Sequence, residues 1–219
     1  MKGSNKLLSL VFMLAVIVFT ITFSIGLPIY VRPFYYVHID ALDMPEEYGV
    51  ERQDIVDAYD EVLDFLTKDD REFGTGFLKH SEEGKKHFED CKVLFDLNKI
   101  AFVVSIAIIV LFFFLDKLGI ITLAKPNGLP MSFYAGIGTL TLFGALGFVV
   151  AKDFQSAFTT FHKIFFPGKE NWLFNPIEDP IILFMPQEFF MDCAILICAS
   201  ILVISIVFIA RGRRNKNLF

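Results

Sequence analysis

Four long apolar segments limit what this chain can fold into more than any other feature. They cover residues 7–30, 98–115, 129–151 and 192–210, and they carry almost no charged side chains. A helix needs about 20 apolar residues to cross a bilayer, so each segment is long enough or nearly so. Because hydrophobic residues also make up 54% of the chain, the sequence predicts an all-α membrane protein built on a bundle of four transmembrane helices.

The charges between these segments predict how the chain crosses the membrane. If all four segments span, one side receives Lys2, Lys6, Lys117, Lys125 and the basic run 211–216. The segment 31–97 instead has 18 acidic and 8 basic residues. Cytoplasmic loops are enriched in Lys and Arg, so we expect cytoplasmic termini and extracytoplasmic regions at 31–97 and 152–191. The whole chain, 1–219, is then a single membrane domain whose first span is retained.

Helical patterns in the acidic outer segment predict a helical extracytoplasmic cap. Residues 53–67 form an amphipathic pattern, with one apolar face made by Ile55, Tyr59, Val62 and Leu66. Ser81 is followed by two glutamates, which indicates a helix start with a capping oxygen and acidic groups near its positive end. That helix would continue through His87 into the second span.

An aromatic segment, residues 158–190, follows the third span. It contains many phenylalanines, four prolines and the single tryptophan of the chain, Trp172. Aromatic residues mixed with turn-forming residues beside a span are typical of a segment at the lipid–water boundary. We therefore predict an interfacial aromatic segment that carries one titratable imidazole, His162.

Two histidines are the candidate catalytic residues. His87 and His162 come from different segments that lie on the same side of the membrane in the predicted topology, and an imidazole can act as a general base near neutral pH. Asp90 lies one helical turn from His87 and could orient it. The alternative is that both are ordinary interfacial histidines. We expect His38 and His80, which lie in the acidic loop, to be solvated surface residues.

Several other residues could support such a site. Trp172, Asn175 and Asp179 could position a substrate headgroup or hold His162, or they could form an interfacial belt with local turns. Arg32, next to the first span, could bind an ester carbonyl or a phosphate, or extend its charge to the membrane surface.

Other chemistries lack their sequence signals. No nucleotide-binding P-loop and no nucleophilic-serine elbow is present, and the charge distribution indicates no nucleic-acid partner. A metal site at His87, Asp90 and His162 is an alternative, but the chain has no short two-ligand motif, so we expect no metal and no cofactor. Cys91 is expected to pack rather than act as a nucleophile, and the three cysteines indicate no disulfide framework.

Two motifs resemble a known family. Residues 87–95, HFEDCKVLF, and residues 161–179, FHKIFFPGKENWLFNPIED, are similar to those of the bacterial lipoprotein intramolecular transacylases, called Lit. The resemblance extends to chain length, the four spans and the large first outer loop. At position 91 the family more often has Val, which argues further against a cysteine nucleophile.

The resemblance implies a function. Such enzymes act on lipoproteins with an N-terminal diacylglyceryl-cysteine, and they move the sn-2 acyl chain to the cysteine α-amino group. His87 and His162 would be the catalytic pair, with His87 as the base and His162 acting on the ester, although the sequence does not decide between the two orders. The implied partners are the diacylated lipoprotein and membrane lipid, and the implied state is a monomer in the bacterial cell membrane with its site at the extracytoplasmic leaflet.

Two alternatives come from other classes of protein. A non-enzymatic four-span scaffold would use the acidic loop and its amphipathic helix as a protein-binding surface. A metal-dependent membrane hydrolase would bind zinc and lose activity with a chelator.

Overall fold

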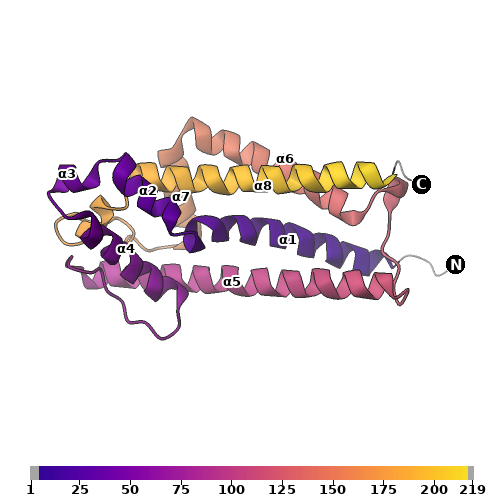
Figure 1. The fold of residues 1–219 in the computed structure, drawn as a ribbon, viewed down its shortest axis with the longest axis horizontal. Helices are drawn as coiled ribbons and strands as arrows, with labels where there is room; N and C mark the ends of the chain where they lie inside the picture. The colour runs from indigo at the N-terminus through magenta and orange to yellow at the C-terminus, as the bar shows by residue number, and fades with distance from the viewer. Residues whose placement is uncertain (1–4, 217–219) are drawn as a thin grey trace. The chain divides into compact units, whose positions relative to one another are not determined.

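The structure is a computed structural model that describes residues 5–216, and every regular element in this range is helical (Figure 1). The elements are α1 Lys6–Tyr30, α2 Pro33–Ala41, α3 Met44–Tyr48, α4 Arg52–Thr67, α5 Glu82–Lys117, the 3-10 turn η1 Pro126–Gly128, α6 Met131–Lys152, α7 Phe154–Phe165, the 3-10 turn η2 Pro180–Leu183 and α8 Gln187–Lys216. The predicted all-α class is therefore confirmed.

Four of these helices are long and apolar enough to cross a membrane, as predicted. They are Lys6–Tyr30, Glu82–Lys117, Met131–Lys152 and Gln187–Arg214. As predicted, α5 begins with charged turns that carry His87 and continues into the second apolar run. Only α8 begins earlier than expected, because a polar turn precedes its apolar run.

The described chain forms two compact units. The membrane unit contains residues 5–27, 98–151 and 195–216, and the polar unit contains residues 28–97 and 152–194. Both histidines of the predicted site belong to the polar unit. The expectation of a single membrane domain stays a prediction.

In the membrane unit, α1 packs on α5 through aromatic rings. Phe19 stacks on Phe102 with ring centroids 5.9 Å apart, and the side-chain amide of Asn98 donates to the carbonyl of Thr22 at 3.2 Å. A polar contact of this kind satisfies a buried amide where no water is present.

The close approach of α6 and α8 depends on two glycines, one on each helix. A Cβ built on Gly136 would lie 2.8 Å from the Ser205 carbonyl oxygen, and one built on Gly212 would lie 2.8 Å from Phe133 Cβ. The hydroxyl groups of Thr139 and Ser205 are 2.7 Å apart. In contrast, a Cβ on Gly138 would meet nothing within 4 Å. Small residues permit close helix packing, and Gly136 and Gly212 are where this contact requires them.

We predict that Gly136→Ala destabilises the membrane unit by about 1–3 kcal/mol, because the new methyl group overlaps the backbone of α8. Gly138→Ala is the matched control, and its methyl group enters open space. The control should be neutral or slightly stabilising, because Ala favours a helix more than Gly does. Apparent melting temperatures in detergent micelles compare the two variants. Equal effects would contradict the assignment of Gly136 as a close contact.

The core of the polar unit is built around α4. The predicted apolar face, Ile55, Tyr59, Val62 and Leu66, is buried as expected. The ring of Tyr59 stacks on Tyr35 of α2 with centroids 3.6 Å apart, and the Tyr35 hydroxyl donates to the Phe184 carbonyl at 2.7 Å. This core therefore connects α2 and α4 with the aromatic segment, residues 158–190.

The expectation for His38 is wrong. Its ring is buried, with Nδ1 2.7 Å from the Phe34 carbonyl and Nε2 2.9 Å from an Asp192 oxygen. The sequence pattern did not indicate α2, and the helical turn from Phe34 to His38 directs the ring toward α8. His80, in contrast, is exposed as predicted.

Candidate active site

His87 is held by the first turns of α5. Ser81 caps this helix, as predicted, because its hydroxyl oxygen accepts from the Gly84 amide at 2.9 Å. The buried carboxylate of Asp179 accepts from both the Ser81 amide and the Ser81 hydroxyl at 2.7 Å. A Cβ on Gly84 would overlap this carboxylate. The aromatic segment is therefore fastened to the start of the helix that carries His87.

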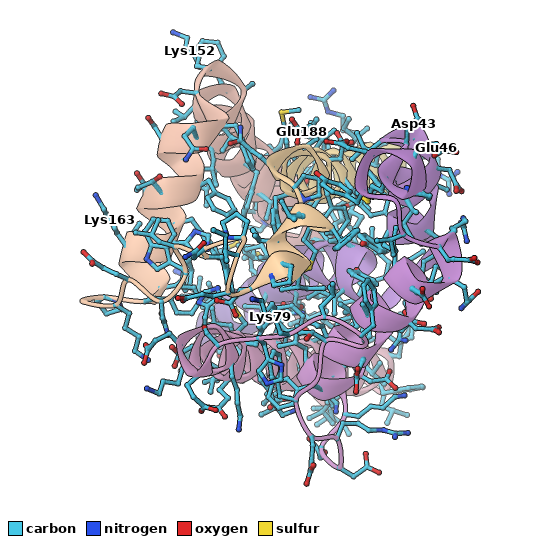
Figure 2. The ribbon with its side chains drawn as sticks, turned by 90° about the vertical axis from the view of Figure 1, so that its left-hand side faces the viewer. Asp43, Glu46, Lys79, Lys152, Lys163 and Glu188 are labelled. Carbon is cyan, nitrogen blue, oxygen red and sulfur yellow. The ribbon has the colours of Figure 1, made fainter. Side chains whose placement is uncertain are left out.

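His162 is held by α7, a helix that the sequence analysis did not identify. Asp153 caps it and accepts from the Ser156 amide at 2.9 Å. The helix ends at Phe165, before Pro167, where a proline disfavours its continuation. Lys163 points away from the ribbon in Figure 2, whereas the neighbouring His162 is buried.

The structure brings the two predicted histidines together. The ring centroids of His87 and His162 are 5.8 Å apart, and the rings are tilted by 33°. Only 5% of His87 and 7% of His162 is exposed. Two imidazoles from distant parts of the sequence thus share one enclosed space.

Aromatic side chains enclose this pair. Phe158 and Trp172 contact His162, with centroid distances of 4.2 and 4.7 Å. Phe166 and Phe174 contact His87 at 5.0 and 5.4 Å. Of these rings, only Trp172 was singled out from the sequence, and the three phenylalanines were not distinguished from the many others in residues 158–190.

The enclosure favours uncharged imidazoles. Burial, together with the neighbouring His162, lowers the pKa of His87 to about 4, against a weaker opposing effect of Asp90. Burial also lowers the pKa of His162, partly opposed by its hydrogen bond to the Phe158 carbonyl. Desolvation disfavours the charged form of a base, so both rings are neutral at pH 7.

The hydrogen bonds distinguish the two rings. His162 Nδ1 lies 2.8 Å from the Phe158 carbonyl oxygen, so this nitrogen carries the proton and Nε2 keeps a free lone pair. His87 Nε2 lies 3.4 Å from the Cys91 sulfur. Burial raises the pKa of Cys91 to about 12, so the sulfur is a protonated thiol, and we assign it as the donor to Nε2. The proton of His87 is then on Nδ1, which is buried without a partner.

The expectation that Asp90 orients His87 is not met. One Asp90 oxygen accepts from the Lys169 ammonium at 2.6 Å, and the other faces the Asn171 amide at 3.4 Å. Burial alone would raise the pKa of Asp90, but the bonds from Lys169 and Asn171 lower it below its ordinary value. Asp90 therefore anchors the loop that follows α7, and Lys169 was not recognised from the sequence.

The other predicted residues have mixed placements. Trp172 stacks on His162, and its indole N–H donates to the Lys169 carbonyl at 3.0 Å. Asn175 forms a local turn by accepting from the Ile177 amide at 3.0 Å. Arg32 pairs with Asp64 and, at 3.1 Å, with Asp60 of α4, so its charge is already neutralised by the protein. A role for Arg32 in binding substrate stays a prediction without a supporting contact.

The metal-site alternative gains no support from the geometry. Among residues 5–216, no group of three or more His, Cys, Asp or Glu side chains is arranged to hold a metal ion. Asp90 is committed to Lys169 and Asn171 rather than to the histidines.

We predict that the fluorescence of Trp172 reports the protonation of His162. Trp172 is the only tryptophan and stacks on this ring, so a protonated imidazole will change its emission through the cation–π interaction. Because the His162 pKa is lowered, the transition should have its midpoint below pH 6.5. His162→Phe should abolish the transition, whereas His80→Phe should keep it. A midpoint at or above 6.5 would contradict the proposed desolvation.

The four apolar helices and the enclosed, uncharged histidine pair define a helical membrane protein with a potential acid–base site. A profile of the family described as lipoprotein intramolecular transacylase Lit matches residues 10–190. The solved structure of the membrane integral lipoprotein intramolecular transacylase Lit from Bacillus cereus has a TM-score of 0.85 and 28% identity, covering 95% of this chain and 94% of that chain.

Two structures of the Bacillus cereus protein with a histidine mutated to arginine or to alanine each give a TM-score of 0.77 at 27% identity. Both cover 95% of this chain, and 90% and 91% of their own chains. No curated protein sequence matches the chain. The chain belongs to the lipoprotein intramolecular transacylase (Lit) family and is an acyltransferase. This membership rejects the scaffold alternative.

Proposed function

We propose that this enzyme converts a diacylglyceryl-cysteine lipoprotein into an N-acyl lyso-lipoprotein. The acyl chain at the sn-2 glycerol ester moves to the α-amino group of the same cysteine. The observation that carries the proposal is the enclosed histidine pair, in which one ring offers a free acceptor nitrogen and the other an unpartnered N–H.

In the proposed reaction, His162 is the base. The substrate amine attacks the ester carbonyl carbon, and His162 Nε2 takes the proton that the amine loses. A free α-amine has a pKa of about 7.7–8.0, so a neutral imidazole is a suitable acceptor near neutral pH.

His87 is the proposed hydrogen-bond donor. Its Nδ1–H would stabilise the oxyanion that forms on the ester, and donors aimed at developing charge contribute strongly in a dry site. The carbon–nitrogen bond forms, the bond to the sn-2 oxygen breaks, and that oxygen leaves with a proton from the pair. This order reverses the sequence-based hypothesis, and the free nitrogen on each ring supports the reversal.

The substrate supplies its own nucleophile, so neither a serine nor a cysteine is needed. Conversion of an ester to an amide proceeds downhill without ATP, metal or cofactor. Holding amine and ester in one molecule supplies much of the rate through proximity. The buried thiol of Cys91, whose pKa is raised, is a poor nucleophile.

We place the site at the extracytoplasmic leaflet of the bacterial cell membrane, with both termini in the cytoplasm. The basic residues Lys6, Lys117, Lys125 and Arg211–Arg214 support this orientation through the positive-inside rule. Lys2, which contributed to the same expectation, lies outside the described residues. We propose that the enzyme acts as a monomer on lipoprotein embedded in membrane lipid.

The test is expression in a bacterial host that makes only diacylated lipoprotein. Mass spectrometry of the lipoprotein N-terminus should show one acyl chain on the α-amine and a lyso-glyceryl group on sulfur. Unchanged diacylglyceryl-cysteine, produced beside protein shown to be folded and inserted, would reject the proposal.

A further inference from the structure

We propose that a groove between α5 and the loop 168–179 binds the peptide that follows the acylated cysteine of the substrate. We further propose that this groove favours basic or uncharged peptides over acidic ones. The inference rests on the proposed function and adds the part of the substrate that the histidine pair does not contact.

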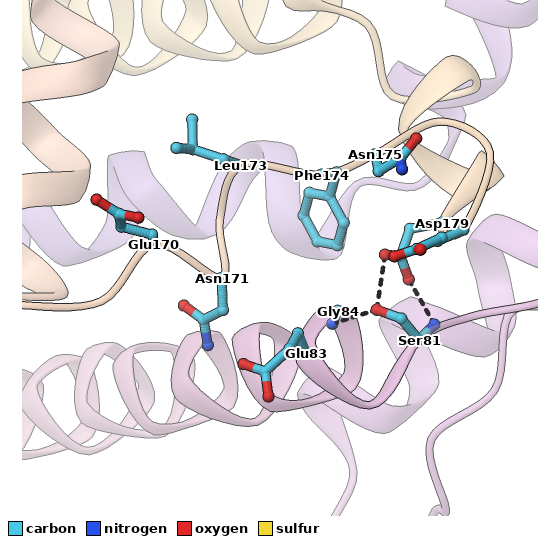
Figure 3. A pocket seen from close by; sticks show the side chains of 10 residues that line it. Ser81, Glu83, Gly84, Glu170, Asn171, Leu173, Phe174, Asn175 and Asp179 are labelled. Carbon is cyan, nitrogen blue, oxygen red and sulfur yellow. Dashed lines mark hydrogen bonds between the residues drawn. The ribbon is translucent and has the colours of Figure 1, made fainter.

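The groove consists of two neighbouring cavities. Their volumes are about 350 and about 390 Å³, and Glu83, Glu170 and Asn171 line both. Each volume lies within the range of about 300–1,000 Å³ that is typical of ligand sites. Figure 3 shows Glu83 on α5 facing Glu170 and Asn171 on the loop.

The charges of the groove suit a cationic ligand. Its two lysines are already paired, Lys86 with Glu83 and Lys169 with Asp90, both at 2.6 Å. Besides Asp179, which accepts hydrogen bonds from Ser81, three carboxylates line the cavities without an ion pair among residues 5–216, and these are Glu89, Glu170 and Glu178. The groove therefore carries a net negative charge. Because charges across an interface are complementary, such a surface favours a positively charged partner over a negatively charged one.

A buried acceptor gives a second and independent indication. Asn171 Oδ1 is buried without a hydrogen-bond partner, while the amide nitrogen of the same side chain faces Asp90. The orientation of the amide is determined, because only its NH₂ group can face a carboxylate. A buried acceptor without a donor is unfavourable, because it has lost its hydrogen bonds to water. A peptide N–H or an ammonium group in the groove would supply that donor.

The groove adjoins the histidine pair. Phe174 lines one cavity and contacts the His87 ring at 5.4 Å. Asp90 lines the other cavity and follows His87 by one helical turn. A peptide in the groove therefore has its first residue near the imidazoles. That residue is the acylated cysteine whose amine reacts.

The test uses synthetic S-diacylglyceryl-cysteine peptides that continue with Ser-Lys-Lys-Lys, Ser-Gly-Asn-Gly or Ser-Glu-Glu-Glu. The peptides are presented in zwitterionic phosphatidylcholine nanodiscs, so that the lipid surface does not select by charge. We expect kcat/KM for the basic peptide to exceed that for the acidic one by about tenfold at low salt. The preference should shrink at 0.5 M salt, where exposed charges are screened.

Charge reversal identifies the groove as the cause. Glu170→Lys with Glu178→Lys should invert the preference, so that the acidic peptide reacts faster than the basic one. Glu46→Lys with Glu47→Lys is the matched control, because it makes the same charge change on α3, which lines neither cavity. The control should keep the preference of the native enzyme.

The outcomes separate the two proposals. Equal rates for all three peptides, or the same inversion by the α3 control, would overturn the groove and leave the acyl transfer intact. No conversion of any peptide by folded enzyme would instead reject the proposed function.

Discussion

Replacing His162 with phenylalanine will lower the rate of acyl transfer by about 10²- to 10⁴-fold, the contribution of a positioned general base. Phenylalanine keeps a planar ring against Trp172 and Phe158, so the enclosure stays filled. What disappears is Nε2, the one nitrogen of the ring that is free to take a proton. The measurement is the single-turnover rate on a diacylglyceryl-cysteine peptide in nanodiscs.

Two comparisons make this result specific. His80→Phe is the matched control, because His80 is an exposed imidazole of the same polar unit, and it should keep full activity. A double variant, His87→Phe with His162→Phe, should lose little more than the worse single variant, because residues that act as a unit are not additive. Activity within about threefold of the native rate in folded His162→Phe would rule out its role as base.

Removing the Asp179 carboxylate will cost about 3–6 kcal/mol of stability. The buried carboxylate accepts two hydrogen bonds from Ser81, and bonds to charged groups contribute about 1.5–3 kcal/mol each. In Asp179→Ala the aromatic segment loses its attachment to the start of α5, so the spacing of His87 and His162 becomes variable. We therefore expect activity to fall together with the apparent melting temperature.

Asp153 offers a close control within the same chain. It accepts from the amide and the hydroxyl of Ser156, at 2.9 and 2.6 Å, in the same two-bond pattern. However, Asp153 is exposed and its contact is local, so Asp153→Ala should cost much less stability than Asp179→Ala, as for an ordinary helix cap. Hydrogen exchange at residues 81–87 would locate the effect. If Asp179→Ala cost no more than Asp153→Ala, the anchoring role would be refuted.

The sequence by itself determined the elements whose signals are local. The four apolar runs, the buried face of α4 and the capped start of α5 are all found where they were predicted. Hydrophobic periodicity and helix capping depend on residues within one or two turns, so they can be read directly. The pairing of His87 with His162 was predicted from two motifs and a topology, and the rings do meet.

Only the tertiary structure decided which polar groups pair over long distances. Asp90 lies one turn from His87, yet it binds Lys169 from a loop about 80 residues away. His38 lies in an acidic loop, yet it is buried against Asp192. Gly136 and Gly212, which are far apart in the sequence, set the close contact between α6 and α8.

The physical reason is the same in each case. A buried polar group must find a partner, and the fold rather than the local sequence determines which partner comes within reach. The same limit applied to the two imidazoles. Their residue types were apparent from the sequence, but the nitrogen that each ring leaves free depends on the Phe158 carbonyl and the Cys91 thiol, whose positions only the folded chain defines.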